Sequence, residues 1–132
     1  MNIFPPVLSL RPLKTTPPTK HELALLALLD VGMDGLSKLN AIGFYGETSL
    51  PSTISELGLK HGFRINRQAR RHMHRHGGMT HCTWYWLADR GEATRAVCFV
   101  NRMRRARKDP PIPFEHVKAL IRGFPSGRTC VD

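Results

Sequence analysis

The stretch from Thr48 to Leu87 changes its hydrophobic period partway along, and it decides the fold: TSLPSTISELGLKHGFRINRQARRHMHRHGGMTHCTWYWL. Its first part has three apolar residues at helical spacing, namely Leu50, Ile54 and Leu57. Gly62 can end that helix, because glycine adopts the left-handed conformation without a steric penalty. Residues 63–66 then alternate between apolar and polar, and residues 80–87 are rich in aromatic and β-branched residues. This order predicts a helix followed by two strands.

The segment between the expected strands, residues 67–78, is dense in arginine and histidine: RQARRHMHRHGG. Gly77 and Gly78 can supply the positive φ angles that a tight hairpin turn requires. Arginines on such a hairpin can bind phosphates or enter a minor groove. Contacts of this kind bind strongly and carry little sequence information.

The histidines of this segment allow a second interpretation, a metal site. His72, His74 and His76 alternate and could share one face of a strand, and His81 and Cys82 follow shortly after. Zinc sites, however, usually show Cys-x2-Cys or His-x3-5-His spacing with four ligands, and the neighbouring arginines oppose a divalent cation. We therefore predict a solvated basic hairpin with no metal and no cofactor. Protonation of these histidines below neutral pH would strengthen phosphate binding by such a hairpin.

Two helices are expected before this stretch. Thr19 and Glu22 match the capping-box pattern, and the leucines after them predict a helix that ends near Gly32. A second helix should start at Asp34 or Ser37. Its buried face is predicted to consist of Leu36, Leu39 and Ile42.

A tight turn over residues 42–46 separates the second helix from the third. Thr48 or Ser49 would cap the third helix, with Pro51 in its first turn, where the missing N–H does no harm. Three short helices with such a turn between the last two form a helix-turn-helix arrangement.

A further helix is expected after the second strand. Asp89 and Glu92 match a second capping box, and the helix should run to about Lys108. Its apolar stripe is Ala93, Ala96, Val97, Val100 and Met103. We expect this helix to cover the strand face that carries Trp84 and Trp86. A last short helix should span residues 114–122. The chain is thus divided into a proline-rich arm (1–18), a helix-turn-helix domain with its hairpin (19–88) and a helical C-terminal extension (89–132).

The charge of the chain points to a polyanionic partner. The net charge is +10, and residues 61–108 contain 12 of the 20 Lys and Arg residues but only two acids. The three cysteines, Cys82, Cys98 and Cys130, do not form a disulfide framework. Neither a signal peptide nor a membrane span is indicated, so the cytoplasm is expected. We also find no nucleophile elbow, no Walker loop and no pair of spaced carboxylates, so an enzyme is not expected.

Residues 19–87 resemble the winged helix-turn-helix family of small bacteriophage and prophage proteins. The matching marks are the leucine-rich first helix, Ser-Thr-Ile-Ser-Glu-Leu at 52–57, Gly-Phe-Arg-Ile at 62–65 and Tyr-Trp-Leu at 85–87. The resemblance implies an α+β winged helix and a duplex-DNA-binding transcriptional regulator in a bacterial host cell. The third helix would then contact bases through Thr48, Ser49, Ser52, Thr53 and Glu56. Phosphates or the minor groove would be contacted by Lys60, Arg64, Arg67, Arg70, Arg71 and Arg75.

Two alternatives stay open. One is a protein-interaction module of phage origin that inhibits or modulates a host complex. The other is an accessory factor in phage DNA replication or recombination. A homodimer is also compatible with the amphipathic pattern of the C-terminal helix.

Overall fold

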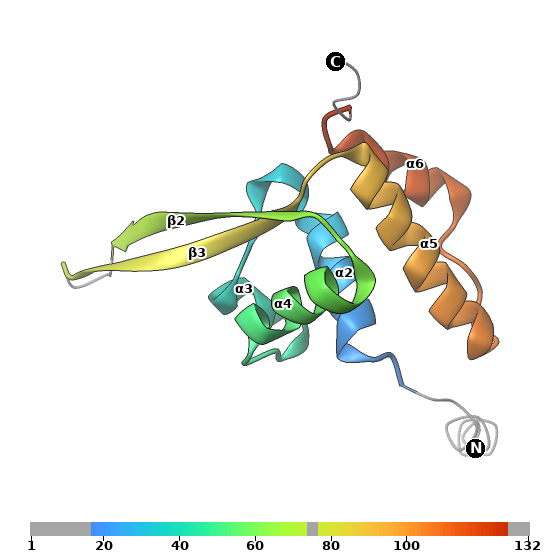
Figure 1. Ribbon diagram of the computed structural model, residues 1–132, viewed down its shortest axis with the longest axis horizontal. Helices are drawn as coiled ribbons and strands as arrows, with labels where there is room; N and C mark the ends of the chain where they lie inside the picture. The colour runs from blue at the N-terminus through green and yellow to red at the C-terminus, as the bar shows by residue number, and fades with distance from the viewer. Residues whose placement is uncertain (1–16, 74–76, 127–132) are drawn as a thin grey trace, which may run out of the picture.

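The computed structural model describes residues 17–73 and 77–126, and it has an α+β fold (Figure 1). These residues form five α-helices, a 3-10 turn and a small antiparallel sheet. The helices are α2 (Lys20–Val31), α3 (Lys38–Tyr45), α4 (Leu50–His61), α5 (Arg90–Ala106) and α6 (Phe114–Arg122), and the 3-10 turn η1 is Gly32–Asp34. The strands are β1 (Leu36–Ser37), β2 (Ile65–Met73) and β3 (Met79–Leu87). The predicted arm lies almost wholly outside the described residues, as do Arg75 and Cys130.

The sheet has the strand order β1-β3-β2, with both neighbours antiparallel to β3. Leu36 on β1 lies opposite Tyr85, and the β2–β3 pairing runs from Ile65 opposite Leu87 to Met73 opposite Met79. In the turn between them, Gly77 has a φ of 96°, as a hairpin turn requires. The result is a long hairpin that projects from the helices (Figure 1).

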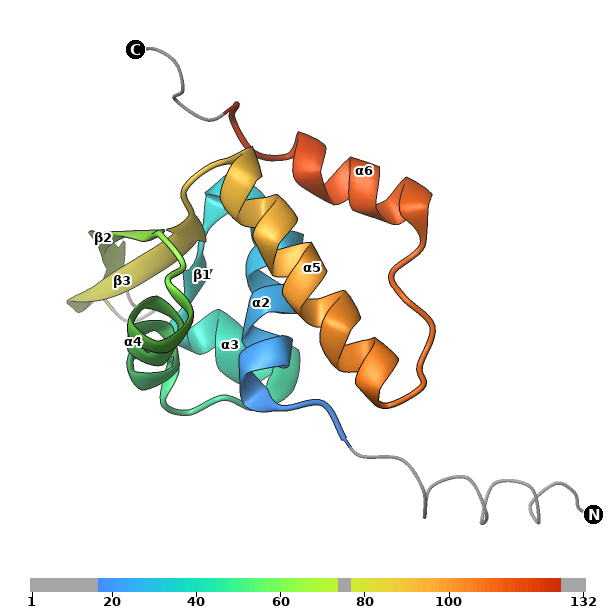
Figure 2. The ribbon, with the colours of Figure 1, turned by 45° about the vertical axis from the view of Figure 1, so that its right-hand side comes forward.

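The core forms around α2, which packs against α4 on one side and α5 on the other (Figure 2). The predicted stripe of α5 is confirmed for its alanines and valines, which are buried with Leu25 and Leu28 of α2, whereas Met103 is only half-buried. Tyr85 and Leu87 of β3 and Phe124, beyond α6, belong to the same cluster. One hydrophobic core therefore joins the helices that precede the hairpin to those that follow it.

Three helix starts are capped as the sequence predicts. The capping side chains are Thr19 for α2, Ser37 for α3 and Asp89 for α5, and each accepts the backbone N–H three residues later. The reciprocal half of the two capping boxes does not form. Glu22 and Glu92 instead turn to arginines from other parts of the chain, Arg107 and Arg64 respectively, and Glu92 also pairs with Arg95.

The predicted buried face of the second helix is wrong in part. Leu39 and Ile42 are 58% and 45% exposed, whereas Leu36 is buried on β1. Helix α3 has only eight residues and is anchored by Ala41, whose small side chain allows close approach. The spacing of Leu36, Leu39 and Ile42 is helical, but Leu36 belongs to strand β1 and precedes the helix.

The prediction that the C-terminal helix covers the tryptophans is also wrong. The chain turns at the end of β3 and α5 packs along α2 instead (Figures 1 and 2). The guanidinium group of Arg70 lies over Trp84 at 5.3 Å and over Trp86 at 5.7 Å. A cation from the neighbouring strand thus covers these rings.

Candidate nucleic-acid interface

The start of α4 is anchored by Glu47, a residue that the sequence interpretation missed. Ser49 occupies the cap position, but its side chain makes no capping hydrogen bond. The buried carboxylate of Glu47 accepts the Ser49 N–H at 2.8 Å and the Thr53 hydroxyl at 2.9 Å. An acid just before a helix start was the available signal, since carboxylates stabilise helix N-termini. The orientation of α4 is therefore fixed by a buried hydrogen-bond pair.

The expected base contact by Thr53 is wrong, because this side chain is 0% exposed. Thr53 lies beside Leu50, Ile54 and Leu57 on the face of α4 that packs into the core. Thr53 comes three residues after Leu50 and four before Leu57, and this spacing places it on their face of the helix. Its role is to hold Glu47 in place.

The exposed face of α4 mixes serine hydroxyls with two apolar residues, one acid and one lysine. A shallow groove of about 410 Å³ is lined by Pro51, Ser52, Ser55, Glu56, Leu59 and Lys60. Thr48 and Ser49 are exposed just before it, and Leu59 is 86% exposed. Four predicted base contacts, Thr48, Ser49, Ser52 and Glu56, are thus brought together at one surface.

Glu56 has a partner within the protein. Its Oε1 lies 2.7 Å from Nε2 of His21 on α2. This hydrogen bond lowers the pKa of the Glu56 carboxyl group, so the group stays ionised. Any base contact by Glu56 would have to share the carboxylate with His21.

The arginines of the hairpin divide between its two faces. Arg67 and Arg71 share one face, opposite Tyr85 and His81 in the register, and the guanidinium of Arg67 lies 5.5 Å from the Tyr85 ring centroid. Arg70 is on the other face, over the tryptophans. The predicted phosphate contacts therefore do not form one continuous surface.

Arg64 lies at the base of the hairpin and faces α5. Its Nη2 donates to Asp89 at 3.0 Å, and its Nε lies 3.4 Å from a Glu92 oxygen. The Asp89 hydrogen bond, with these nearby charges, raises the pKa of Arg64. Two carboxylates therefore already neutralise this predicted phosphate contact, and it joins the start of β2 to the start of α5.

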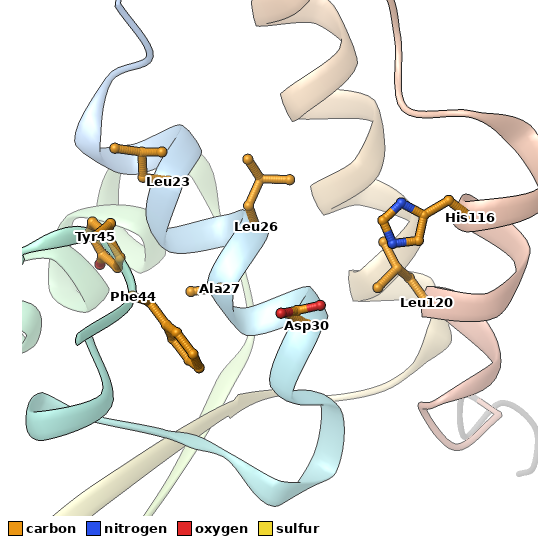
Figure 3. A pocket seen from close by; sticks show the side chains of 8 residues that line it. All are labelled: Leu23, Leu26, Ala27, Asp30, Phe44, Tyr45, His116 and Leu120. Atoms are coloured by element: carbon orange, nitrogen blue, oxygen red, sulfur yellow. The ribbon is translucent and has the colours of Figure 1, made fainter. Parts of the chain in front are cut away.

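A separate apolar cavity of about 270 Å³ lies between α2, α3 and α6 (Figure 3). Its lining is Leu23, Leu26, Ala27, Asp30, Phe44, Tyr45, His116 and Leu120. Burial and the nearby Glu47 carboxylate raise the pKa of the Tyr45 phenol, which stays neutral. Asp30 and His116 are the remaining ionisable groups of this lining.

Over residues 17–73 and 77–126, no group of three or more His, Cys, Asp or Glu side chains is placed to hold a metal ion. His74 and His76 of the metal hypothesis lie outside these ranges, and the side chain of His72 is not among those described. In the same part of the chain, no helix has the length and apolar character needed to cross a membrane. Cys82 and Cys98 are free. Comparisons with protein-family models, curated proteins and solved structures found no match.

Proposed function

We propose that this chain binds duplex DNA as a winged helix. Helix α4 would lie in the major groove, and the β2–β3 hairpin would be the wing that contacts phosphates or the minor groove. The observation that carries the proposal is that α4 and the β2–β3 hairpin lie next to each other. Helix α4, anchored at its start by Glu47, exposes hydroxyl-bearing side chains. The hairpin that lies beside it (Figure 1) carries arginines in its register.

The contacts divide between base recognition and phosphate binding. Thr48, Ser49 and Ser52 have hydroxyl groups that can bond to base edges, and Glu56 can accept a hydrogen bond from a cytosine amino group. Arg67 and Arg71 would bind phosphates from one face of the wing. Lys60 stands at the other end of α4, where it can reach a phosphate.

The biological role that we propose is transcriptional regulation by a phage or prophage protein in the cytoplasm of a bacterial host. The support for it is the resemblance of residues 19–87 to that family, together with the net charge of +10. No catalytic role is proposed.

Fluorescence anisotropy with a random-sequence duplex, titrated at several salt concentrations, tests DNA binding. We expect micromolar affinity that falls steeply with salt, with a log–log slope of about −0.9 for each phosphate contact. The double variant Arg67→Gln with Arg71→Gln tests the wing, because loss of two phosphate contacts should lower the magnitude of the slope by about 1.8. Absence of binding by the natural chain at low salt would overturn the proposal.

The same titration with a single strand of equal length separates regulation from an accessory role in replication or recombination. Tighter binding to the duplex is the result expected of a regulator. Equal or tighter binding to the single strand would favour the accessory role.

A second candidate function, protein binding, is favoured by the apolar surface on α3. Leu39, Ile42 and Phe44 are exposed, and Phe44 also lines the cavity between α2, α3 and α6 (Figure 3). Exposed apolar groups in such proximity are typical of protein contacts. Sedimentation of the natural chain and of Phe44→Ser would test a homodimer, since only the natural chain should then self-associate. Pull-down of a host protein after nuclease treatment would test a host complex.

A further inference from the structure

We propose a second phosphate-binding site, formed by Lys60 of α4 and Arg102 of α5, which holds the DNA backbone on the side of the major groove away from the wing. This inference rests on the proposed function and adds α5 to the DNA interface. The phosphodiester oxygens of duplex DNA are the ligand.

The site is a groove of about 340 Å³ between the end of α4 and the outer face of α5. Its lining residues are Lys60, His61, Phe63, Arg95, Phe99 and Arg102. Lys60 and Arg102 are both exposed, and neither forms an ion pair with an acid in the part of the chain that the structure describes. These two cations are therefore available to an external anion.

The rings of His61, Phe63 and Phe99 line this groove. The Arg102 guanidinium lies 5.7 Å from the Phe99 ring centroid. Phe99 in turn packs edge-to-face on His61 at 5.0 Å and on Phe63 at 6.1 Å. A cation over an aromatic face is stabilised there and keeps its N–H groups directed sideways, where they can donate to phosphate oxygens.

The carbonyl groups at the end of α4 would ordinarily repel an anion at this position. Arg95 offsets this repulsion, because it donates hydrogen bonds to two of these carbonyl groups. Its Nη2 donates to His61 O at 2.9 Å and its Nη1 to Gly62 O at 3.1 Å. Arg95 also pairs with Glu92, so its charge is used within the protein. The nearest acid along α4, Glu56, is held by His21.

The position of the groove fits the geometry of a duplex. Figure 1 shows the hairpin on one side of α4 and, beyond α2, helix α5 on the other. The major groove is about 12 Å wide and is bordered by a phosphate backbone on each side. A helix placed in it requires cations at both borders, and the exposed face of α4 offers few of its own. Arg67 and Arg71 would serve one border, and Lys60 with Arg102 the other.

The test is the salt dependence of duplex binding by Lys60→Gln, Arg102→Gln and their double variant. Lys118→Gln is the matched control, because it removes an exposed cation of α6 outside this groove. At 0.1 M salt, we expect about eightfold weaker binding for each single variant and a slope smaller by about 0.9. The log–log slope of the double variant should be smaller in magnitude by about 1.8, and the control should bind like the natural chain. Thermal melts confirm that each variant is folded.

The outcomes separate this inference from the proposed function. If the natural chain and the wing variants behave as expected but Arg102→Gln matches Lys118→Gln, the second site is overturned and the winged-helix proposal stands. If the natural chain does not bind duplex DNA, both fall. Loss of slope in Arg102→Gln and Lys60→Gln, with an unchanged control, supports the second site.

Discussion

The carboxylate of Glu22, near the start of α2, accepts hydrogen bonds from both terminal nitrogens of Arg107, directly after α5. The Glu22 side chain is 1% exposed and that of Arg107 is 10% exposed. Arg107 also donates to Asp109, at 3.0 Å. The pKa of Arg107 is raised, chiefly by its hydrogen bond to Glu22. This pair fastens the first described helix to the end of the longest one.

We expect Arg107→Met to destabilise the protein strongly, because it leaves the Glu22 charge buried without its partner. Loss of one member of a buried ion pair typically costs about 3–5 kcal/mol. Replacing both members, Glu22→Met with Arg107→Met, should recover most of that stability, since an apolar pair needs no desolvation of charge. Urea unfolding at pH 7 measures both, with the exposed Arg105→Met as control. A loss below about 1 kcal/mol for Arg107→Met would contradict the role of Arg107 as the partner that the buried Glu22 charge requires.

Ser52 and Thr53 are neighbours on α4 with opposite expected effects. Thr53→Val removes the hydroxyl that binds Glu47, so it should lower the free energy of unfolding by about 1–3 kcal/mol and leave the DNA sequence preference unchanged. Ser52→Ala should change the sequence preference with little effect on stability, because its side chain is exposed. Binding to a randomised duplex library, paired with urea unfolding, separates the two. An unchanged preference for Ser52→Ala would count against α4 in the major groove.

The two faces of the hairpin make a prediction about adjacent arginines. Arg71→Ala should weaken binding to all duplex sequences alike, since phosphate contacts carry no base information, and Arg70→Ala, on the other face, should weaken it less. Only Arg70→Ala should also alter tryptophan fluorescence in the free protein, because Arg70 lies over Trp84 and Trp86. Anisotropy against several duplexes and an emission spectrum measure these effects. An equal change of emission in both variants would contradict the assignment of faces.

Asp89 should contribute to the pH dependence of stability. Its hydrogen bond from the Glu92 N–H, with help from Arg64, lowers the pKa of its carboxyl group. Its contribution is therefore fully present above the ordinary aspartate pKa of about 3.9 and is lost as the pH falls through the lower folded-state pKa. We expect Asp89→Asn to cost about 1 kcal/mol at pH 7 and much less at pH 2. Urea unfolding at both pH values measures it. A constant difference would show that ionisation of Asp89 is not the cause.

Local patterns were sufficient to predict most of the secondary structure. Thr19, Ser37 and Asp89 cap the helices as predicted, because a cap depends only on residues within one turn. The helix that ends at Gly62 and the hairpin with Gly77 follow from backbone preferences of glycine.

Contacts between distant segments were not predictable in this way. The capping-box pattern assigns Glu22 and Glu92 to their own helices, but Arg107 and Arg64 compete for them from far along the chain. The group that covers the tryptophans depends on where α5 packs, which local patterns do not reveal. Arg70 of the neighbouring strand covers them instead. Of the expected interface, the base contact by Thr53 is wrong because it rests on residue type, whereas the spacing of Thr53 from Leu50 and Leu57 places it on the buried face.

The single core has a consequence for modularity. A chain cut after Leu87 would retain the three helices and hairpin of the winged helix that we propose, yet it would uncover the α2 surface on which Ala93, Ala96 and Val100 pack. It would also leave Arg64 without either carboxylate and Glu22 without Arg107. The DNA-binding unit that we propose is therefore not portable. Fusion, transplantation or dissection of this protein must keep α5 together with Arg107.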